Sequence, residues 1–247
     1  MTDSKPRTTI ETVTFLKPYR VLADNYDLLV FDLDGTLVDS LEDLAESVNH
    51  VLSTMSRPPL SLGVVRSYVG DGVGKLISRS LGDGVAPSEL TAGLGTFVEH
   101  YEANCLRHTT PYPGVSEALK ALAGKSLAVL TNKPEAMTER ILDGLELRGY
   151  FGEVVGADGA PAKKPDPRGL LGLVERAGVA PERTLLVGDT GIDVQTARAS
   201  AIHVAGVAYG FRPEELEESP PDYVLESLMQ LLGPPETVRY DRQERDR

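Results

Sequence analysis

The sequence has little cysteine and no long apolar run, and each shortage excludes a class of protein. Cys105 is the only cysteine, which excludes an intrachain disulfide and a cysteine-rich zinc or iron–sulfur site. No segment approaches the ~20 consecutive apolar residues that a membrane-spanning helix needs, and the polar start of the chain lacks the apolar core of a secretory signal. We therefore expect a cytoplasmic protein without a membrane partner.

Positive charge is also scarce. The chain has 37 acidic against 25 basic residues and a formal net charge of −12, so its average field repels the phosphate backbone of nucleic acid. Nucleic acid is therefore not an expected partner, although a few cations and backbone N–H groups in one cleft can still bind a small anion. The 247 residues favour one main domain with a smaller insertion, and we expect a monomer or a homodimer.

Short apolar runs alternate with segments of helical spacing along most of the chain. Each run leads into a polar or glycine-containing turn, as buried parallel strands do. The predicted strands are Tyr26–Phe31, Ser126–Leu130, Glu153–Val155, Thr184–Val187 and His203–Val207. The predicted helices between them are Val115–Ala123, Glu135–Leu147, Pro167–Ala177 and Ile192–Ala199. This alternation predicts an α/β fold with a Rossmann-like, doubly wound parallel sheet.

One long stretch after the first strand has no core strand. It is better interpreted as an inserted helical cap than as a loop, because loops of such length are uncommon in compact domains. Its predicted helices are Leu41–Met55, Val64–Val69, Gly74–Leu81 and Ser88–Arg107. The resulting prediction is an N-terminal extension over 1–25, a catalytic core over 26–40 and 111–232, a helical cap over 41–110, and a polar tail over 233–247.

The first predicted strand runs directly into Asp32-Leu33-Asp34-Gly35-Thr36. Ligands of open α/β sheets bind at the carboxyl ends of strands, so both carboxylates emerge at a candidate site. An ionised Asp32 can attack phosphorus, while a protonated Asp34 can give a proton to a leaving oxygen. A simple hairpin turn at Asp34-Gly35 remains an alternative. An EF-hand calcium loop fits less well, because Leu37 stands where the loop requires glycine.

Two further candidate motifs lie later in the chain. The first follows a predicted strand, and the second precedes a predicted helix. Thr131-Asn132-Lys133-Pro134 offers donors to a phosphoryl oxygen at a helix start, but it is also an ordinary N-cap with proline at the first helical position. Lys164 precedes Pro165, which favours an extended backbone at the lysine. Its cation can balance nearby carboxylates, or it can be a solvated surface lysine.

The last motif is Gly188-Asp189-Thr190-Gly191-Ile192-Asp193, again directly after an apolar strand. Asp189 would lie level with Asp32 in a parallel sheet, and such an oxygen-rich set suits Mg²⁺. Asp189 as a helix cap and Asp193 as a partner of a neighbouring side chain are the alternatives.

The order of these motifs is more specific than any one of them. FDLDGTLVDS, TNKP, KKPDP and GDTGID together resemble the four motifs of the haloacid dehalogenase-like hydrolase superfamily over about residues 26 to 230. The resemblance implies a Rossmann-like core, a helical cap inserted after the first motif, and an essential Mg²⁺ ion. It further implies that Asp32 is the nucleophile and a metal ligand, that Asp34 is the general acid and base and a metal ligand through its backbone carbonyl, and that Asp189 completes the metal site.

The same resemblance assigns the remaining site residues. Thr131 and the Asn132 amide would hold phosphoryl oxygens, Lys164 would neutralise the nucleophile and the phosphate, and Asp193 would orient Lys164 or a metal-bound water. Aspartate at position 34 favours phosphoryl transfer over dehalogenation.

A narrower resemblance concerns the substrate. TPYPGV at 110–115 and GVAYGF at 206–211, together with TNKP, resemble phosphoglycolate phosphatases. In the predicted cap, Gly72, Gly74 and Lys75 resemble a substrate-facing loop, and an ordinary flexible turn is the alternative. The expected function is a Mg²⁺-dependent phosphatase, a phosphoric monoester hydrolase, acting on a small phosphorylated metabolite such as 2-phosphoglycolate. The alternatives are a β-phosphoglucomutase-like phosphotransferase and a noncatalytic phosphate-binding regulatory protein.

Overall fold

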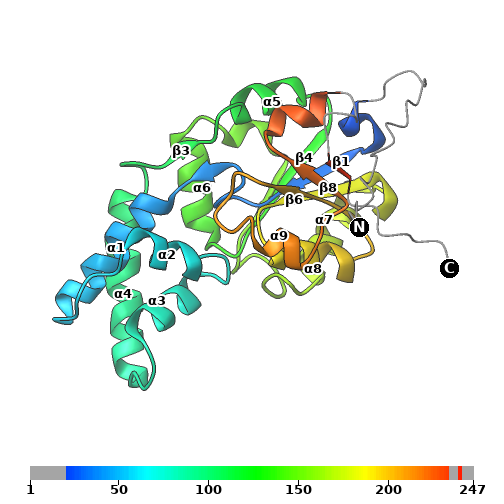
Figure 1. The fold of residues 1–247 in the computed structure, drawn as a ribbon. Coiled ribbons are helices and arrows are strands. Elements are labelled where there is room, and N and C mark those ends of the chain that lie inside the picture. Colours follow the sequence, from blue (N-terminus) through cyan, green and yellow to red (C-terminus); the bar gives the residue numbers. More distant parts are fainter. Residues whose placement is uncertain (1–20, 234–238, 241–247) are drawn as a thin grey trace, which may run out of the picture.

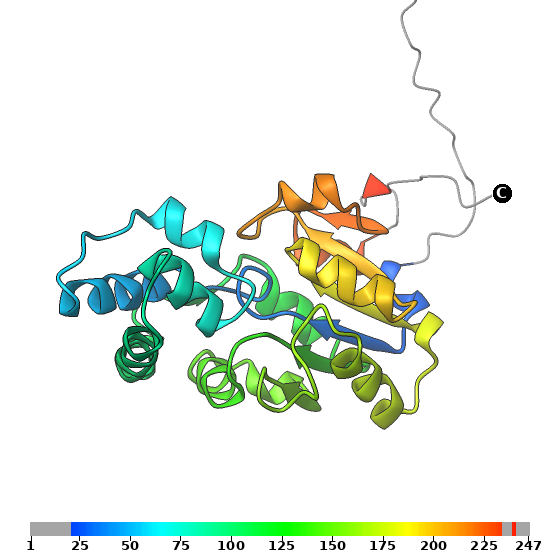
Figure 2. The ribbon, with the colours of Figure 1, turned by 90° about the horizontal axis from the view of Figure 1, so that it is seen from below.

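The computed structural model describes residues 21–233 and 239–240 of the chain. A central sheet lies at one end of the molecule and a group of helices at the other (Figure 1). Seen from below, the sheet has helices on both sides (Figure 2). No helix within the described ranges is long and apolar enough to cross a membrane.

The sheet has the strand order β5-β4-β1-β6-β7-β8-β9. The first six of these strands are parallel, and β9 runs antiparallel to β8. The bounds are β1 (Leu28–Phe31), β4 (Ser126–Leu130), β5 (Glu153–Val155), β6 (Thr184–Gly188), β7 (His203–Val207), β8 (Tyr223–Leu225) and β9 (Arg239–Tyr240). The prediction of an α/β Rossmann-like sheet is therefore confirmed, with β8 and β9 added at one edge.

Strand β1 is buried on both faces, which explains its uninterrupted apolar sequence. Leu29 and Phe31 belong to one apolar cluster, and Leu28 and Val30 belong to another on the opposite face. The first cluster includes residues of α5 (Val115–Ala121) and α6 (Glu135–Gly144), whereas the second includes residues of α7 (Arg168–Ala177) and α8 (Gly191–Ala199). The helices therefore cover both faces of the sheet.

Shorter elements complete this part of the fold. Helix α9 (Glu215–Glu218) follows β7, and the described residues also form the 3₁₀ turns η1 (Leu22–Asn25), η2 (Arg148–Tyr150), η3 (Pro181–Arg183) and η4 (Leu228–Leu232). Leu22 and Ala23 are buried, so the end of the expected N-terminal extension packs on the core. Residues 1–20 of that extension lie outside the described ranges. Of the expected polar tail, Arg239–Tyr240 form the edge strand β9.

Four helices follow β1 and form what we call the helical segment, residues 41–104. They are α1 (Leu41–Thr54), α2 (Leu62–Tyr68), α3 (Val73–Leu81) and α4 (Pro87–Asn104). They pack against one another through buried apolar side chains that include Val48, Ile77 and Phe97. The four helices lie within the range expected to be a helical cap.

The chain enters and leaves the helical segment through a small antiparallel pair. Strand β2 (Val38–Asp39) pairs with β3 (Thr110–Pro111). Beside this pair the buried carboxylate of Asp43 accepts hydrogen bonds from the backbone N–H groups of His108 and Thr109 and from the Thr109 hydroxyl, at 2.7–3.1 Å. The two connections are therefore tied to each other as well as to the core.

Candidate active site

The site lies where three adjacent parallel strands end. Register pairs Phe31 of β1 with Val129 of β4 and with Val187 of β6. Asp32 therefore follows β1 at the level where β4 and β6 also end, close to Thr131 and Asp189. Side chains more than 150 positions apart in the sequence meet because parallel strands present their carboxyl ends at one edge.

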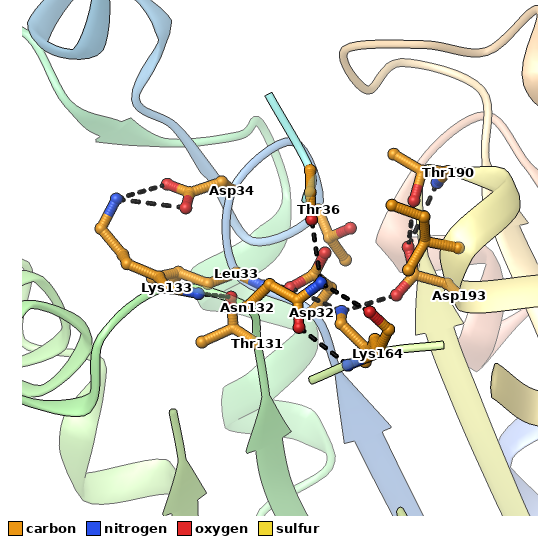
Figure 3. Close-up of polar contacts among 12 residues, drawn as sticks. Asp32, Leu33, Asp34, Thr36, Thr131, Asn132, Lys133, Lys164, Thr190 and Asp193 are labelled. Atoms are coloured by element: carbon orange, nitrogen blue, oxygen red, sulfur yellow. Dashed lines mark hydrogen bonds and ion pairs between the residues drawn. The ribbon is translucent and has the colours of Figure 1, made fainter. Parts of the chain in front are cut away.

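Lys164 joins two buried carboxylates at the centre of the site (Figure 3). Its Nζ atom lies 3.0 Å from Asp32 Oδ1 and 2.6 Å from Asp193 Oδ1. The other oxygen of Asp193 accepts hydrogen bonds from the backbone N–H and the hydroxyl of Thr190, at 3.2 and 2.9 Å. Asp193 therefore takes part in the N-terminal capping box of α8 and also holds Lys164 in place.

Negative charge exceeds positive charge in this cluster. Burial raises the pKa of the Asp32 carboxyl to about 6, although Lys164 opposes that effect. Burial, together with the charges of Asp32 and Asp193, raises the pKa of Asp189 well above its ordinary value. Burial alone would lower the pKa of Lys164, but Asp193 and Asp32 outweigh it and the pKa is raised. One ammonium group thus faces three carboxylates.

A divalent cation fits this excess of charge. Oxygens of Asp32, Asp189 and Asp193 all lie within 4.8 Å of one another, and all three residues are buried. Hard cations such as Mg²⁺ prefer carboxylate oxygens, and a bound cation favours the ionised carboxylates that burial disfavours. The donor set therefore suits a divalent metal.

Two glycines make room for Asp189. Gly35 has φ +83° and a side chain there would overlap the Asp189 carboxylate, as would a side chain at Gly210. Asp189 Oδ2 accepts a hydrogen bond from the Phe211 N–H at 2.8 Å, and the Thr36 hydroxyl lies 3.4 Å from Oδ1. The chain does turn at Gly35, where its backbone lies against Asp189, but β1 pairs with β4 and β6 and β2 pairs with β3, so this turn does not join a hairpin.

Asp34 lies in a separate ion pair, on the other side of Asp32 from Lys164 (Figure 3). Its two oxygens lie 3.0 and 3.1 Å from Lys133 Nζ, and Oδ1 also accepts a hydrogen bond from the Ser40 hydroxyl at 2.5 Å. Lys133 Nζ in turn lies 2.8 Å from the Tyr101 hydroxyl of α4 and 4.5 Å from the centre of that ring. Asp32 and Asp34 thus have different electrostatic surroundings, as different chemical roles require.

Thr131 and Asn132 lie between these two ion pairs. The Thr131 hydroxyl accepts a hydrogen bond from the Lys133 N–H at 3.2 Å, so it does act as a local cap. The Asn132 side chain donates to the backbone carbonyls of Gly70 and Lys164 and accepts from the Lys164 N–H. The side chain of Asn132 therefore fixes Lys164 and the loop at Gly70, and its contact with a phosphoryl group remains a prediction.

A small cavity of about 40 Å³ separates these residues from the helical segment. Asp32, Asp34, Thr131, Asn132 and Lys133 line it from the strand ends, and Leu44, Val69, Gly70, Gly72, Val73 and Leu76 line it from the helical segment. Such a space holds only a few water molecules. It therefore suits a small ligand.

The structure separates the three residues expected in the substrate-facing loop. Gly72 lines the cavity, has φ +86°, and a Cβ atom there would lie 2.8 Å from the Asn132 carbonyl oxygen. Gly74 and Lys75 lie outside the lining, and Lys75 is exposed. Val73 and Leu76 face the cavity, so the 100° step of the helix turns the two intervening residues away. Of these three residues, only Gly72 lines the cavity, as a residue of a substrate-facing loop should.

The sequence pattern does not identify several residues of this site. Lys133 stands in a segment typical of a helix start, and Tyr101 follows Phe97 by four positions, as residues of an ordinary core stripe do. Arg66 of α2 donates hydrogen bonds to the backbone carbonyls of Gly210 and Phe211, and nothing in its sequence surroundings signals this contact. For Lys133, the available sequence signal was its position directly after two polar residues, Thr131 and Asn132, at a strand end.

These features define an α/β protein whose strand ends carry paired aspartates, two buried lysines and a place for a cation. A family model described as haloacid dehalogenase-like hydrolase matches residues 29–207. The chain therefore belongs to the haloacid dehalogenase-like hydrolase family, which confirms the resemblance inferred from the four motifs.

Curated relatives support the narrower group. Phosphoglycolate phosphatase 1 of Pseudomonas aeruginosa is 40% identical over 215 residues, which cover 83% of this chain and 78% of that protein. The phosphoglycolate phosphatase of Pseudomonas putida is 39% identical over the same shares of the two chains. This confirms that the chain resembles phosphoglycolate phosphatases.

Solved structures agree in fold. A predicted phosphoglycolate phosphatase from Haemophilus somnus has a TM-score of 0.80 at 32% identity, and the match covers 84% of this chain and 97% of that one. A predicted phosphatase from Clostridium acetobutylicum has a TM-score of 0.73 at 26% identity, and covers 83% and 96%.

Proposed function

We propose that this protein is a Mg²⁺-dependent phosphatase that hydrolyses a small phosphate monoester through an aspartyl-phosphate on Asp32, with 2-phosphoglycolate as the first candidate substrate. The observation that carries this proposal is the separation of two neighbouring aspartates into two buried ion pairs. Asp32 lies with Lys164 and the acidic cluster, and Asp34 lies with Lys133. The names of the relatives support the substrate.

The metal site in this proposal uses carboxylates of Asp32 and Asp189 and the backbone carbonyl of Asp34. When bound, Mg²⁺ neutralises charge on the phosphoryl oxygens, which is the main demand of phosphoryl transfer. Asp193 lies 2.6 Å from Lys164 Nζ and holds this lysine beside Asp32, so the lysine can stabilise the oxygens that gain charge. Thr131 supplies a hydroxyl from the end of β4.

The chemistry then proceeds in two displacements at phosphorus. A carboxylate oxygen of Asp32 attacks phosphorus as the bond to the leaving oxygen breaks, and protonated Asp34 gives its proton to that oxygen. Asp34 next accepts a proton from a water molecule, whose oxygen attacks phosphorus. This step releases phosphate and restores the Asp32 carboxylate.

The helical segment acts as a lid in this proposal, and the expected domain division, a helical cap at 41–110 on a core of 26–40 and 111–232, rests on the same argument. The lid contacts the core through Arg66 on the 210–211 loop, through Asn132 on the Gly70 carbonyl and through Tyr101 on Lys133. A closed lid excludes bulk water, which would otherwise weaken every electrostatic contact in the site.

Release of phosphate from a panel of small monoesters, with Mg²⁺ and with excess chelator, tests the proposal. Asp32→Asn should abolish release, because an amide is neither a competent nucleophile nor an anionic ligand. Asp143→Asn, at an exposed position of α6, makes the same change away from the site and should keep full activity. Isomerisation of sugar phosphates, measured in parallel, would instead indicate a mutase. Full activity of Asp32→Asn would eliminate the mechanism.

A further inference from the structure

The cavity has two chemically different walls. Its strand-end wall carries Asp32, Asp34, Thr131 and Lys133, whereas the helical segment contributes the apolar side chains of Leu44, Val69, Val73 and Leu76. Among the described residues that line the cavity, Lys133 is the only one with a positive charge. A negatively charged leaving group would therefore find one cation there.

The positions of the two aspartates decide which end of a substrate meets Lys133. The phosphoryl group must lie beside Asp32 and Lys164, and the leaving oxygen must lie within reach of Asp34. Lys133 Nζ lies within 3.1 Å of both Asp34 oxygens, and both side chains lie on the side of Asp32 away from Lys164 (Figure 3). The leaving group therefore extends toward Lys133.

We propose that Lys133 is a specificity-determining residue that pairs with a carboxylate on the leaving group, so that the enzyme selects short phosphorylated carboxylic acids. This inference rests on the proposed phosphatase function. A carboxylate that enters a buried, largely apolar cavity needs an ionic or hydrogen-bonding partner, because its desolvation is otherwise too unfavourable. The ammonium group has three donors, so a substrate carboxylate can share it with Asp34 while Tyr101 holds it in place.

Two other cations near the cavity are bound to other groups. Lys164 is bound between Asp32 and Asp193, and Arg66 donates to the carbonyls of the 210–211 loop. Lys163 is exposed and its Nζ lies close to Gly72, but it is outside the cavity lining. Lys163 therefore offers a matched control for the loss of one lysine beside the same loop.

A simpler role for Lys133 makes a different prediction. If the ammonium only positions Asp34, its removal slows the proton transfers for every substrate by the same factor. If it also pairs with the leaving group, its removal affects charged leaving groups much more than neutral ones. Two substrates of equal length separate these roles: 2-phosphoglycolate, which ends in a carboxylate, and 2-hydroxyethyl phosphate, which ends in a hydroxyl.

The experiment compares kcat/KM for the two substrates, with saturating Mg²⁺, in wild type, Lys133→Met, Lys133→Arg and Lys163→Met. We expect wild type to prefer 2-phosphoglycolate by about 10²-fold, the scale on which loss of one partner of a buried ion pair acts. Lys133→Met should reduce this preference to near 1, Lys133→Arg should restore part of it, and Lys163→Met should leave it unchanged. Equal fractional losses on both substrates in Lys133→Met, or no preference in wild type, would overturn the proposal.

A binding measurement covers the case in which Lys133→Met turns over neither substrate. Calorimetric titration with 3-phosphonopropionate and with propylphosphonate compares a carboxylate with a methyl group on otherwise similar, non-hydrolysable ligands. Wild type should bind the carboxylate ligand more tightly and Lys133→Met should not, provided that its circular dichroism and Tm show a folded protein. A preference kept by Lys133→Met overturns the inference. Absence of phosphate release from every monoester by wild type would instead reject the proposed function.

Discussion

The charge imbalance around Asp32 predicts an unusual dependence of stability on pH in the metal-free protein. The pKa of this carboxyl is about 6 in the folded chain, against an ordinary value of 3.8. The folded protein then binds the proton more tightly than the unfolded chain does, so the contribution of Asp32 to stability is fully present below about pH 4 and is lost as pH rises through 6. The two pKa values correspond to about 3 kcal/mol of unfolding free energy.

Asp32→Asn removes this loss, because an amide does not titrate. We expect the unfolding free energy of the variant, minus that of wild type, to increase by about 2.5 kcal/mol between pH 4 and pH 7 in excess chelator. Urea denaturation followed by circular dichroism, at several pH values, measures this difference. Asp143→Asn controls for the loss of one surface carboxylate.

Added Mg²⁺ should reverse the order of the two proteins near neutral pH. A cation that binds only the folded state stabilises it in proportion to its affinity, and wild type has one more anionic ligand than Asp32→Asn. Wild type should therefore gain more stability from Mg²⁺ at pH 7. A stability difference that stays constant from pH 4 to pH 7 without metal would refute the raised pKa.

Three further predictions concern Asp34, the loop at Gly72 and the connection after α4. Asp34→Asn should reduce kcat by on the order of 10²–10⁴, as loss of acid and base catalysis does, while Mg²⁺ affinity, measured by titration, changes little because the backbone carbonyl remains. Gly72→Ala should reduce kcat/KM for 2-phosphoglycolate about tenfold, because the residue has a positive φ and the new Cβ would lie 2.8 Å from the Asn132 carbonyl oxygen. Gly74→Ala is the control: its Cβ would meet no atom within 4 Å, so its kcat/KM should remain near that of wild type. Equal effects of these two substitutions on kcat/KM would show that Gly72 does not belong to the site. Asp43→Asn should destabilise the fold by about 3 kcal/mol in urea denaturation, because it weakens charge-assisted hydrogen bonds to the connection after α4; an unchanged midpoint would contradict that role.

Local pattern was enough to predict most of the core. A strand buried on both faces needs a continuous apolar run, so Leu28–Phe31 and Thr184–Gly188 were visible in the sequence. The edge strands β8 and β9 were not predicted. Strand β8 (Tyr223–Leu225) is short, and only the last of its three residues is fully buried. Boundaries differed by a few residues where helix ends depend on tertiary contacts, as at Glu135–Gly144.

Sequence pattern was likewise insufficient for the loop before α3 in the helical segment. Glycine at both 72 and 74 indicated close backbone approach, but sequence spacing could not say which one approaches the core. Packing of α3 against the strand ends decides that Gly72 faces Asn132 and that Gly74 faces open space.

The sequence by itself determined the parallel α/β core and the placement of Asp32, Thr131 and Asp189 at strand ends, because a strand fixes the direction in which its next residue emerges. Only the tertiary structure decided that Lys133 pairs with Asp34 and Tyr101 rather than with solvent. These three residues come from separate segments, and their contact depends on how the helical segment packs over the sheet, which no local pattern encodes.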